Sequence, residues 1–286
     1  MSRQTSHLSA WEPSPAQAWR VDVAQVPRRV YTLHMIAIGA LLCAHLLVYL
    51  FVPQFNNEAL SKVGTVFDLG EETSIPNFFP GTMLMATAFV AAAIALHHKA
   101  RASRTWRSWG LASAALTFLA FDEGAMLHDR LSQVIETNVA PQGLFYIGWT
   151  LPYMFVVLAA VLAGLPLLRS LSPRTTFRLV QAGALYVFGA LGLEMVEGAL
   201  LEQSVPHGTS FREALMIGVP PAWAVLVTVE EACEMVAVAL ALRGLLLHLT
   251  EDIGIARLTI SHQFPASPNP HHAARSPERL AKPTKA

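Results

Sequence analysis

The stretch GLASAALTFLAFDEGAMLHDR, residues 110–130, combines two kinds of sequence that rarely occur together. Its first twelve residues are apolar or small, as in a helix that crosses a membrane, but Asp122, Glu123, His128 and Asp129 follow at once. A charged side chain at the centre of a membrane-spanning helix costs about 2.5 to 3.5 kcal/mol on insertion scales. The stretch therefore predicts a membrane helix that ends in a functional polar site.

The composition of the whole chain also favours a membrane protein. Of its 286 residues, 53% are hydrophobic and only 14% are charged, whereas an ordinary soluble domain carries about 25% charged residues. Twenty basic residues balance twenty acidic ones, so no net charge points to nucleic acid as a partner. The two cysteines, Cys43 and Cys233, lie in apolar runs, which argues against a disulfide framework.

Six apolar runs reach about 20 residues, the length that a bilayer requires. We therefore predict an all-α fold, a polytopic integral membrane protein with a bundle of six transmembrane helices. The predicted spans are residues 30–52, 78–96, 109–128, 144–168, 179–201 and 220–242, the last with a helix that can continue to residue 248. Acids in the third, fifth and sixth spans lower their mean hydropathy, but their lengths and flanks are those of spans.

The basic residues predict the orientation of the spans. Of the 20 Lys and Arg residues, 17 fall in the terminal segments and in the loops after the second and fourth spans. Lys62, Arg130 and Arg212 are the single basic residues of the other three loops. Because cytoplasmic loops are enriched in Lys and Arg, both termini are expected in the cytoplasm, with the chain in a cytoplasmic (inner) membrane.

Three parts follow from this topology. Residues 1–29 form a cytoplasmic N-terminal segment without a signal-peptide pattern, so the first apolar run is expected to remain as an anchor. Residues 30–248 form the six-helix transmembrane domain. Residues 249–286 form a cytoplasmic tail rich in Pro, Ser and basic residues, which we expect to be disordered.

Acids of three spans lie at similar depths, given the rise of about 1.5 Å per helical residue. Spacings of three and four residues also put the acids of the fifth span, and those of the sixth, on shared helix faces. No Lys or Arg lies within these three spans, so the acids must be protonated or must bind a cation. The polar groups expected at this depth are Asp122, Glu123, His128, Glu194, Glu197, Glu230, Glu231, Glu234 and, in the first span, His45.

One pair in this set does not fit a regular helix. At 100° per residue, Glu123 and His128 lie about 140° apart around the helix axis. A one-residue π-bulge aligns residues five apart, and such bulges are frequent at functional sites. We therefore expect a π-bulge near Gly124.

Carboxylates with a minority of imidazole suit iron, manganese or zinc. We expect Asp122 and Glu230 to act as catalytic acids or bases beside the metal. The expected ligands are Glu123, His128, Glu194, Glu197, Glu231, Glu234 and His45. The ligand count resembles that of di-iron bundles, although their Glu-x-x-His pattern is absent; a single zinc with an activated water is the neighbouring interpretation. A third interpretation is that neutral carboxyl groups hydrogen-bond between helices without metal.

Four motifs together resemble a family of uncharacterised bacterial multi-pass membrane proteins. They are the Asp-Glu-x4-His-acid motif at residues 122–129, LEMVEG at 193–198, TVEEACEM with its Glu-Glu-x-x-Glu motif at 228–235, and FDLGEETSIPNFF at 67–79. The family usually has His-Glu where this chain has His128 and Asp129. The resemblance implies one functional unit without naming its chemistry. It consists of Asp122, Glu123, His128, Glu194, Glu231 and Glu234.

Three functions fit this pattern. The first is a metal-dependent membrane enzyme that acts on a lipid or another apolar substrate. The second is a proton- or cation-coupled transporter, although paired broken helices and a convincing internal repeat are missing. The third is a non-catalytic scaffold or sensor. Membrane lipids are the expected partners, nucleic acid is not expected, and Gly and Ala faces on several spans leave a homodimer open.

Overall fold

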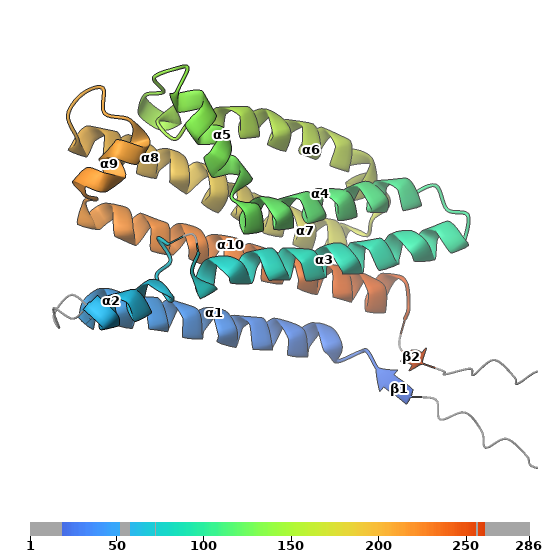
Figure 1. Ribbon diagram of the computed structural model, residues 1–286. Coiled ribbons are helices and arrows are strands. Elements are labelled where there is room, and N and C mark those ends of the chain that lie inside the picture. The colour runs from blue at the N-terminus through green and yellow to red at the C-terminus, as the bar shows by residue number, and fades with distance from the viewer. Residues whose placement is uncertain (1–18, 52–57, 72, 256, 261–286) are drawn as a thin grey trace, which may run out of the picture. The chain divides into compact units, whose positions relative to one another are not determined.

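The computed structural model describes residues 19–51, 58–71, 73–255 and 257–260 (Figure 1). The expectations for the first 18 residues and for the tail beyond residue 260 lie outside these ranges. The chain divides into two compact units: residues 23–256 form the larger one, and the segments before and after it form the smaller one.

The smaller unit contains a two-stranded antiparallel sheet. Strand β1 (Trp19–Asp22) pairs with β2 (Arg257–Ile260), with Trp19 opposite Ile260 and Asp22 opposite Arg257. No strand was predicted, because four residues are too few for an alternating pattern to stand out. In the segment expected to be disordered from residue 249, helical structure continues as far as Asp252 and β2 covers residues 257–260.

The larger unit is all-helical over its described residues, as predicted. Its first elements are α1 (Val26–Phe51), α2 (Glu58–Thr65), α3 (Ile75–Ala100), α4 (Trp106–Ala125), α5 (Leu127–Glu136) and the 3₁₀-helix η2 (Gly143–Phe145). Next come α6 (Thr150–Ser170), α7 (Pro173–Val187), the π-helix η3 (Phe188–Leu193) and α8 (Glu194–Ser204). The last are α9 (Phe211–Ile217), α10 (Pro221–Leu247) and the π-helix η4 (His248–Asp252).

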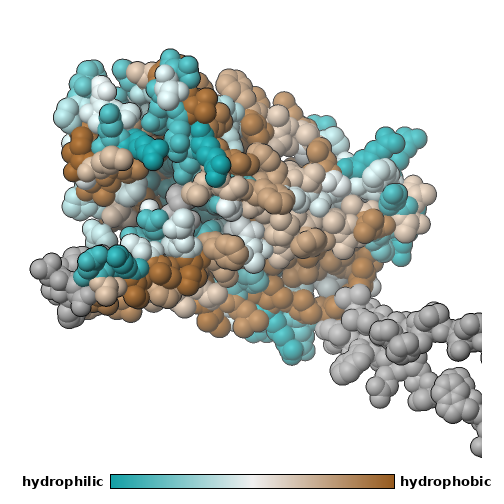
Figure 2. All heavy atoms as spheres, in the orientation of Figure 1, coloured by the Kyte–Doolittle hydropathy of each residue, from teal (hydrophilic) through white to brown (hydrophobic). Residues whose placement is uncertain are grey.

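Four helical stretches are long and apolar enough to cross a membrane: α1, α3, α6 and the continuous stretch Pro173–Ser204. The bent pair α4 and α5 makes a fifth if it counts as one span. Only 6% of the apolar window of α6 and 11% of that of α1 are buried inside the protein. Figure 2 shows mainly apolar residues along the middle of one face and hydrophilic residues towards its ends. These features indicate a membrane protein.

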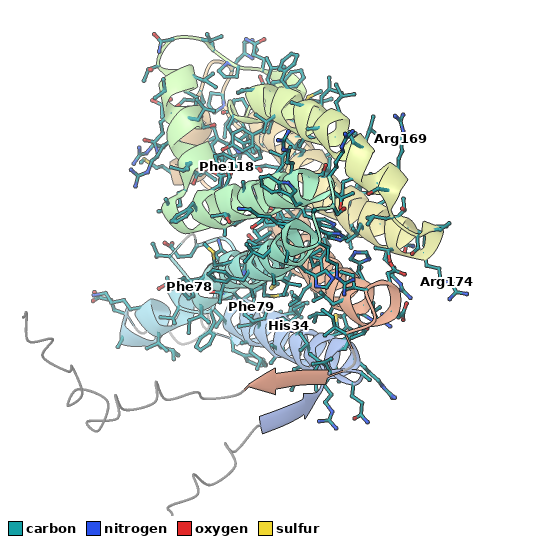
Figure 3. All side chains as sticks on the ribbon, turned by 90° about the vertical axis from the view of Figure 1, so that its right-hand side faces the viewer. His34, Phe78, Phe79, Phe118, Arg169 and Arg174 are labelled. Atoms are coloured by element: carbon teal, nitrogen blue, oxygen red, sulfur yellow. The ribbon has the colours of Figure 1, made fainter. Side chains whose placement is uncertain are left out.

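The two ends of the helix bundle differ in their loops (Figure 1). We call the end with α2, α5 and α9 the acidic end, because the acids described below lie towards it. The opposite end holds the α3–α4 turn, residues 101–105, and the α6–α7 turn, residues 171–172. We call it the basic end; Figure 3 views the bundle from there and shows Arg169 and Arg174 pointing away from the helices.

Helix α10 is the core of the bundle. It contacts α1, α3, α7, η3 and α8, and its Met235, Val238 and Ala239 are at most 2% exposed. A proline at its first helical position begins this helix, and its length of 27 residues brings buried positions to both ends of the bundle. The acids of α10 are therefore carried into the protein interior by the helix with the most partners.

Candidate functional site

A cavity of about 230 Å³ lies at the acidic end, lined by residues from the eight helices α3 to α10, from the π-helix η3 and from two connecting segments. Eight carboxyl side chains and one imidazole line it, and none of the Lys and Arg residues that the structure describes does. They are Asp122, Glu123, His128, Asp129, Glu194, Glu197, Glu230, Glu231 and Glu234. Every site residue predicted from the sequence except His45 is among them, and the cavity adds Asp129.

The chain reaches this cavity through a sharp break after α4. Met126 adopts a left-handed conformation with φ 50° and ψ 49°, and the axes of α4 and α5 differ by 67°. The predicted π-bulge near Gly124 is therefore wrong, because the helix breaks instead of bulging. The break lets the Asp122 carboxylate accept the His128 backbone N–H at 3.0 Å, at the start of α5 where amides lack helical partners.

A π-helix does occur, but on another span. η3 directly precedes Glu194, and it packs closely against α10 through Gly189. A Cβ atom at Gly189 would lie 3.2 Å from Cγ of Glu234 and 3.2 Å from the carbonyl oxygen of Glu230. Glycine thus permits the close approach that brings the acids of α8 and α10 to the same cavity.

Three aromatic side chains donate hydrogen bonds to the acids. The Tyr153 hydroxyl donates to Asp122 Oδ1 at 3.0 Å, and the Tyr186 hydroxyl donates to Glu123 Oε1 at 2.9 Å. The indole N–H of Trp149 donates to Glu194 Oε1 at 2.8 Å. Our sequence reasoning missed these residues. The available signal was a Tyr or Trp within an apolar span, because a buried O–H or N–H needs a polar partner.

Two pairs of carboxyl groups are in direct contact. Glu123 and Glu234 are in side-chain hydrogen-bonding contact, and so are Glu197 and Glu230. Two ionised carboxylates repel each other and cannot form such a bond. Each pair therefore shares a proton or needs a cation beside it.

His128 lies between two further acids. Its Nδ1 is 3.4 Å from Asp122 Oδ1, and its Nε2 is 3.9 Å from Asp129 Oδ1. Its ring also lies 5.1 Å from that of Trp149. A carboxylate beside one ring nitrogen orients an imidazole and sets which nitrogen carries the lone pair.

The cavity also holds polar atoms that lack partners. Among the described residues, five buried side-chain polar atoms make no hydrogen bond, and three of them belong to cavity-lining residues. These are Asn77 Oδ1, Glu197 Oε1 and Trp223 Nε1. Buried polar atoms nearly always have a partner, so these three indicate a place for a polar ligand, an ion or water. Asn77 and Trp223 were not predicted.

Six of the seven predicted metal ligands line the cavity, but they do not converge on one point. Within the described part of the chain, no group of three or more His, Cys, Asp or Glu side chains has the geometry to hold a metal ion. The donor set itself, carboxylates with one imidazole, is of the kind that iron, manganese and zinc accept.

His45 lies outside the cavity lining and holds a loop instead. In the neutral ring, Nδ1 accepts the Leu69 N–H at 3.0 Å and Nε2–H faces the Thr228 hydroxyl oxygen at 3.2 Å. Asp68 Oδ1 lies 3.4 Å from Nδ1, and the two side chains form an ion pair only when the ring is protonated. Because Leu69 and Gly70 line the cavity, His45 connects the loop over the cavity to α1 and α10.

The chain was compared with known proteins. No curated protein and no solved structure matches it. A family model described as "Domain of unknown function (DUF8692)" matches residues 35–249, which include every helix from α3 to α10 and all residues that line the cavity. The chain belongs to this family.

Proposed function

We propose that the chain is a six-span protein of a bacterial inner membrane whose acidic cavity binds a divalent cation for chemistry on a lipid or another apolar substrate. In this topology the bent pair α4 and α5 is the third span, and α10 is the sixth. Glu230, Glu231 and Glu234 reduce the hydropathy of α10, but its 27 residues exceed the bilayer requirement. The distribution of basic residues supports cytoplasmic termini and an outer position for the cavity.

The observation that carries this proposal is a cavity lined by many acids and, among the described residues, by no Lys or Arg. Eight carboxyl groups and one imidazole line a volume of about 230 Å³. Ionised side chains within a bilayer are rare, and those that occur pair with one another or mark ion and substrate pathways. A bound cation would offset part of this negative charge and would also satisfy Glu197 Oε1, which has no partner among the described residues.

In this function the side chains have distinct roles. Glu123, His128, Glu194, Glu197, Glu231 and Glu234 are the candidate ligands. Asp122 positions His128 through its contacts with the backbone N–H and Nδ1. Glu230, which contacts Glu197, is the candidate general base. The metal, when bound, would polarise a substrate oxygen or activate a water.

Elemental mass spectrometry tests this proposal on the full chain purified in mild detergent without chelators. We expect one or two equivalents of iron, manganese or zinc, and loss of this metal in the double variant Glu194→Ala with Glu234→Ala. The matched control is Glu58→Ala with Glu71→Ala, which removes two exposed acids. An absence of metal from the native chain, or equal metal in all three folded proteins, would contradict the proposal.

The paired carboxyl groups favour a second candidate, proton-coupled transport. A shared proton between Glu123 and Glu234, or between Glu197 and Glu230, explains these contacts without metal, and acids inside membranes often form proton relays. We would reconstitute the chain in liposomes with a trapped pH dye. This candidate requires proton movement that Glu123→Gln with Glu234→Gln abolishes, and dye signals equal to those of empty liposomes would refute it.

A further inference from the structure

The five unpartnered polar atoms fall into two groups. Three belong to residues that line the acidic cavity, whereas the remaining two are imidazole nitrogens, His98 Nε2 on α3 and His248 Nε2 at the start of η4. Both belong to the basic end. His248 follows Glu234 by fourteen residues, which is about 21 Å along a helix. The two histidines therefore lie away from the acidic cavity.

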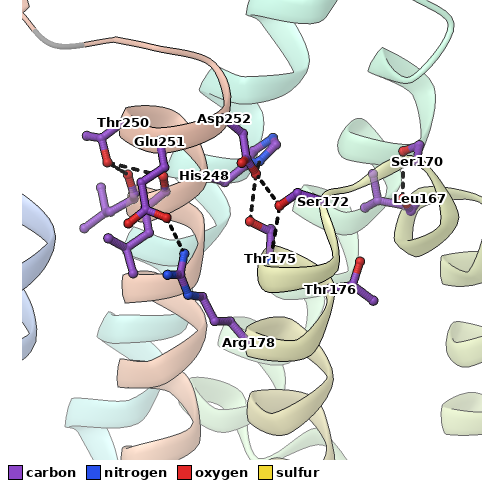
Figure 4. A network of polar contacts seen from close by, with 12 residues as sticks. Leu167, Ser170, Ser172, Thr175, Thr176, Arg178, His248, Thr250, Glu251 and Asp252 are labelled. Atoms are coloured by element: carbon purple, nitrogen blue, oxygen red, sulfur yellow. Dashed lines mark hydrogen bonds and ion pairs between the residues drawn. The ribbon is translucent and has the colours of Figure 1, made fainter.

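Asp252 orients the ring of His248. The Asp252 Oδ2 atom accepts hydrogen bonds from His248 Nδ1 at 2.7 Å, from the Thr175 hydroxyl at 2.8 Å and from the Ser172 hydroxyl at 3.1 Å (Figure 4). Because Nδ1 carries the proton that it donates in the hydrogen bond to the carboxylate, the lone pair of the neutral ring is on Nε2. That nitrogen is buried and free of any partner among the described residues.

The surroundings fix this ring further. The side chain of His248 is 7% exposed, and its ring stacks on that of Trp109 at 5.2 Å with an interplanar angle of 27°. Trp109 is itself 1% exposed. Ile94 and Ala95 on α3 pack in one hydrophobic cluster with Leu245 on α10 and with Leu249. His98 follows the first two by one helical turn, and His248 lies between the other two. Two imidazole nitrogens from different helices thus lack partners in one region of the fold.

We propose that His98 and His248 provide two ligands of a second cation site, which takes a divalent first-row transition metal such as zinc or cobalt. Imidazole nitrogen suits these metals and does not suit magnesium or calcium, which prefer oxygen. A histidine ligand usually donates its other ring N–H to a carboxylate, as His248 does to Asp252. Two protein ligands leave the remaining positions of the metal to water or to an incoming molecule.

The nearby charges permit a cation at this position. Arg178, at the same end of the bundle, is paired with Glu251 at 2.8 Å (Figure 4). Asp252 adds a negative charge behind His248. The positive charges that act on His98 are those of His97, His248 and Arg101, and Arg101 is exposed to solvent.

The test uses cobalt alone as the probe, in a chain whose acidic cavity carries Glu194→Ala with Glu234→Ala. These two substitutions remove candidate ligands from the acidic cavity, so cobalt that still binds reports on the histidine site alone. Either proposal can therefore fail without the other. We expect one equivalent of cobalt with an absorption spectrum typical of nitrogen ligands. His98→Ala and His248→Ala should each abolish it, and Asp252→Asn should weaken affinity about 10- to 100-fold.

His34→Ala is the matched control, because His34 Nδ1 already contacts the Val30 carbonyl oxygen on α1. This variant should bind cobalt like its parent. Circular dichroism and gel filtration identify the variants that are folded. Absence of cobalt binding in the folded parent, or binding that survives in both His98→Ala and His248→Ala, would overturn the proposal. In that case a water that bridges His98 Nε2 and His248 Nε2 would be the partner of both nitrogens.

Discussion

At the scale of single residues, His45 and Asp68 hold the loop over the acidic cavity. His45 faces Leu69 on the loop and Thr228 on α10, and Asp68 Oδ1 accepts the Gly70 N–H at 3.0 Å. The His45 ring beside its carboxylate lowers the pKa of Asp68 below its ordinary value, burial opposes this shift, and the hydrogen bond from the Gly70 N–H adds to the lowering. The ionised form of Asp68 therefore stabilises the loop.

The pH dependence of the loop follows from the direction of this shift. The stabilising contribution is fully present above the ordinary pKa of 3.8 and is lost as the pH falls through the lower value in the folded chain. Because the Asp68 side chain is 44% exposed, we expect less than about 1 kcal/mol. Hydrogen exchange of residues 68–70 should be faster in Asp68→Asn than in the native chain at pH 6. The two proteins should become alike in acid, and equal exchange at pH 6 would contradict the assignment.

Met126 carries the backbone strain of the break between α4 and α5. A left-handed conformation costs an L-residue about 1 to 2 kcal/mol and costs glycine nothing. Met126→Gly should therefore be more stable than Met126→Ala by about 1 kcal/mol, although both lack the native side chain. Thermal unfolding in detergent measures the difference. A more stable alanine variant would mean that α4 and α5 form one unbroken helix, in which alanine is preferred.

At the scale of elements, close packing brings the acids together. Helix α8 approaches the segment before α6 through Gly198, where a Cβ atom would lie 2.9 Å from Ile147 Cγ1. Ile147 is 2% exposed and has little room to move. This contact positions Glu197, one residue earlier on α8, beside the cavity.

Gly198→Ala tests this contact. We expect a loss of about 1 to 3 kcal/mol of stability, because extra atoms in a packed core force neighbours out of place. The control is Gly164→Ala on α6, where no atom lies within 4 Å of the added Cβ and where alanine favours the helix. Thermal unfolding followed by circular dichroism compares the two. Equal midpoints for both variants would show that α8 and Ile147 are not tightly packed.

At the scale of the whole molecule, the proposed topology places the acidic end outside the cytoplasm. Two single-cysteine variants test it in a chain that lacks Cys43 and Cys233: Ser103→Cys at the basic end and Asn138→Cys at the acidic end. In intact cells, a membrane-impermeant maleimide should label Asn138→Cys and should spare Ser103→Cys until the cells are opened. The reverse pattern would place the acidic cavity on the cytoplasmic side.

The sequence by itself determined the helical, membrane-type character of the chain and the identity of most cavity residues. Apolar length and periodicity are local properties, so the predicted span of residues 78–96 falls within α3, and that of residues 220–242 begins one residue before α10 and ends within it. Acids without basic partners in apolar helices are equally visible in a sequence, since the energetic penalty belongs to each residue. For this reason eight of the nine predicted site residues line the cavity.

Only the tertiary structure decided how these residues meet. The break at Met126, the π-helix before Glu194 and the close approach at Gly189 depend on contacts between helices far apart in the sequence. The role of His45 also depends on a distant contact, because its partner Leu69 lies 24 residues away. The hydrogen bonds from Trp149, Tyr153 and Tyr186 to the acids likewise join residues far apart in the sequence. Residue spacing gives the face of a regular helix, but it cannot reveal where packing makes the helix depart from regularity.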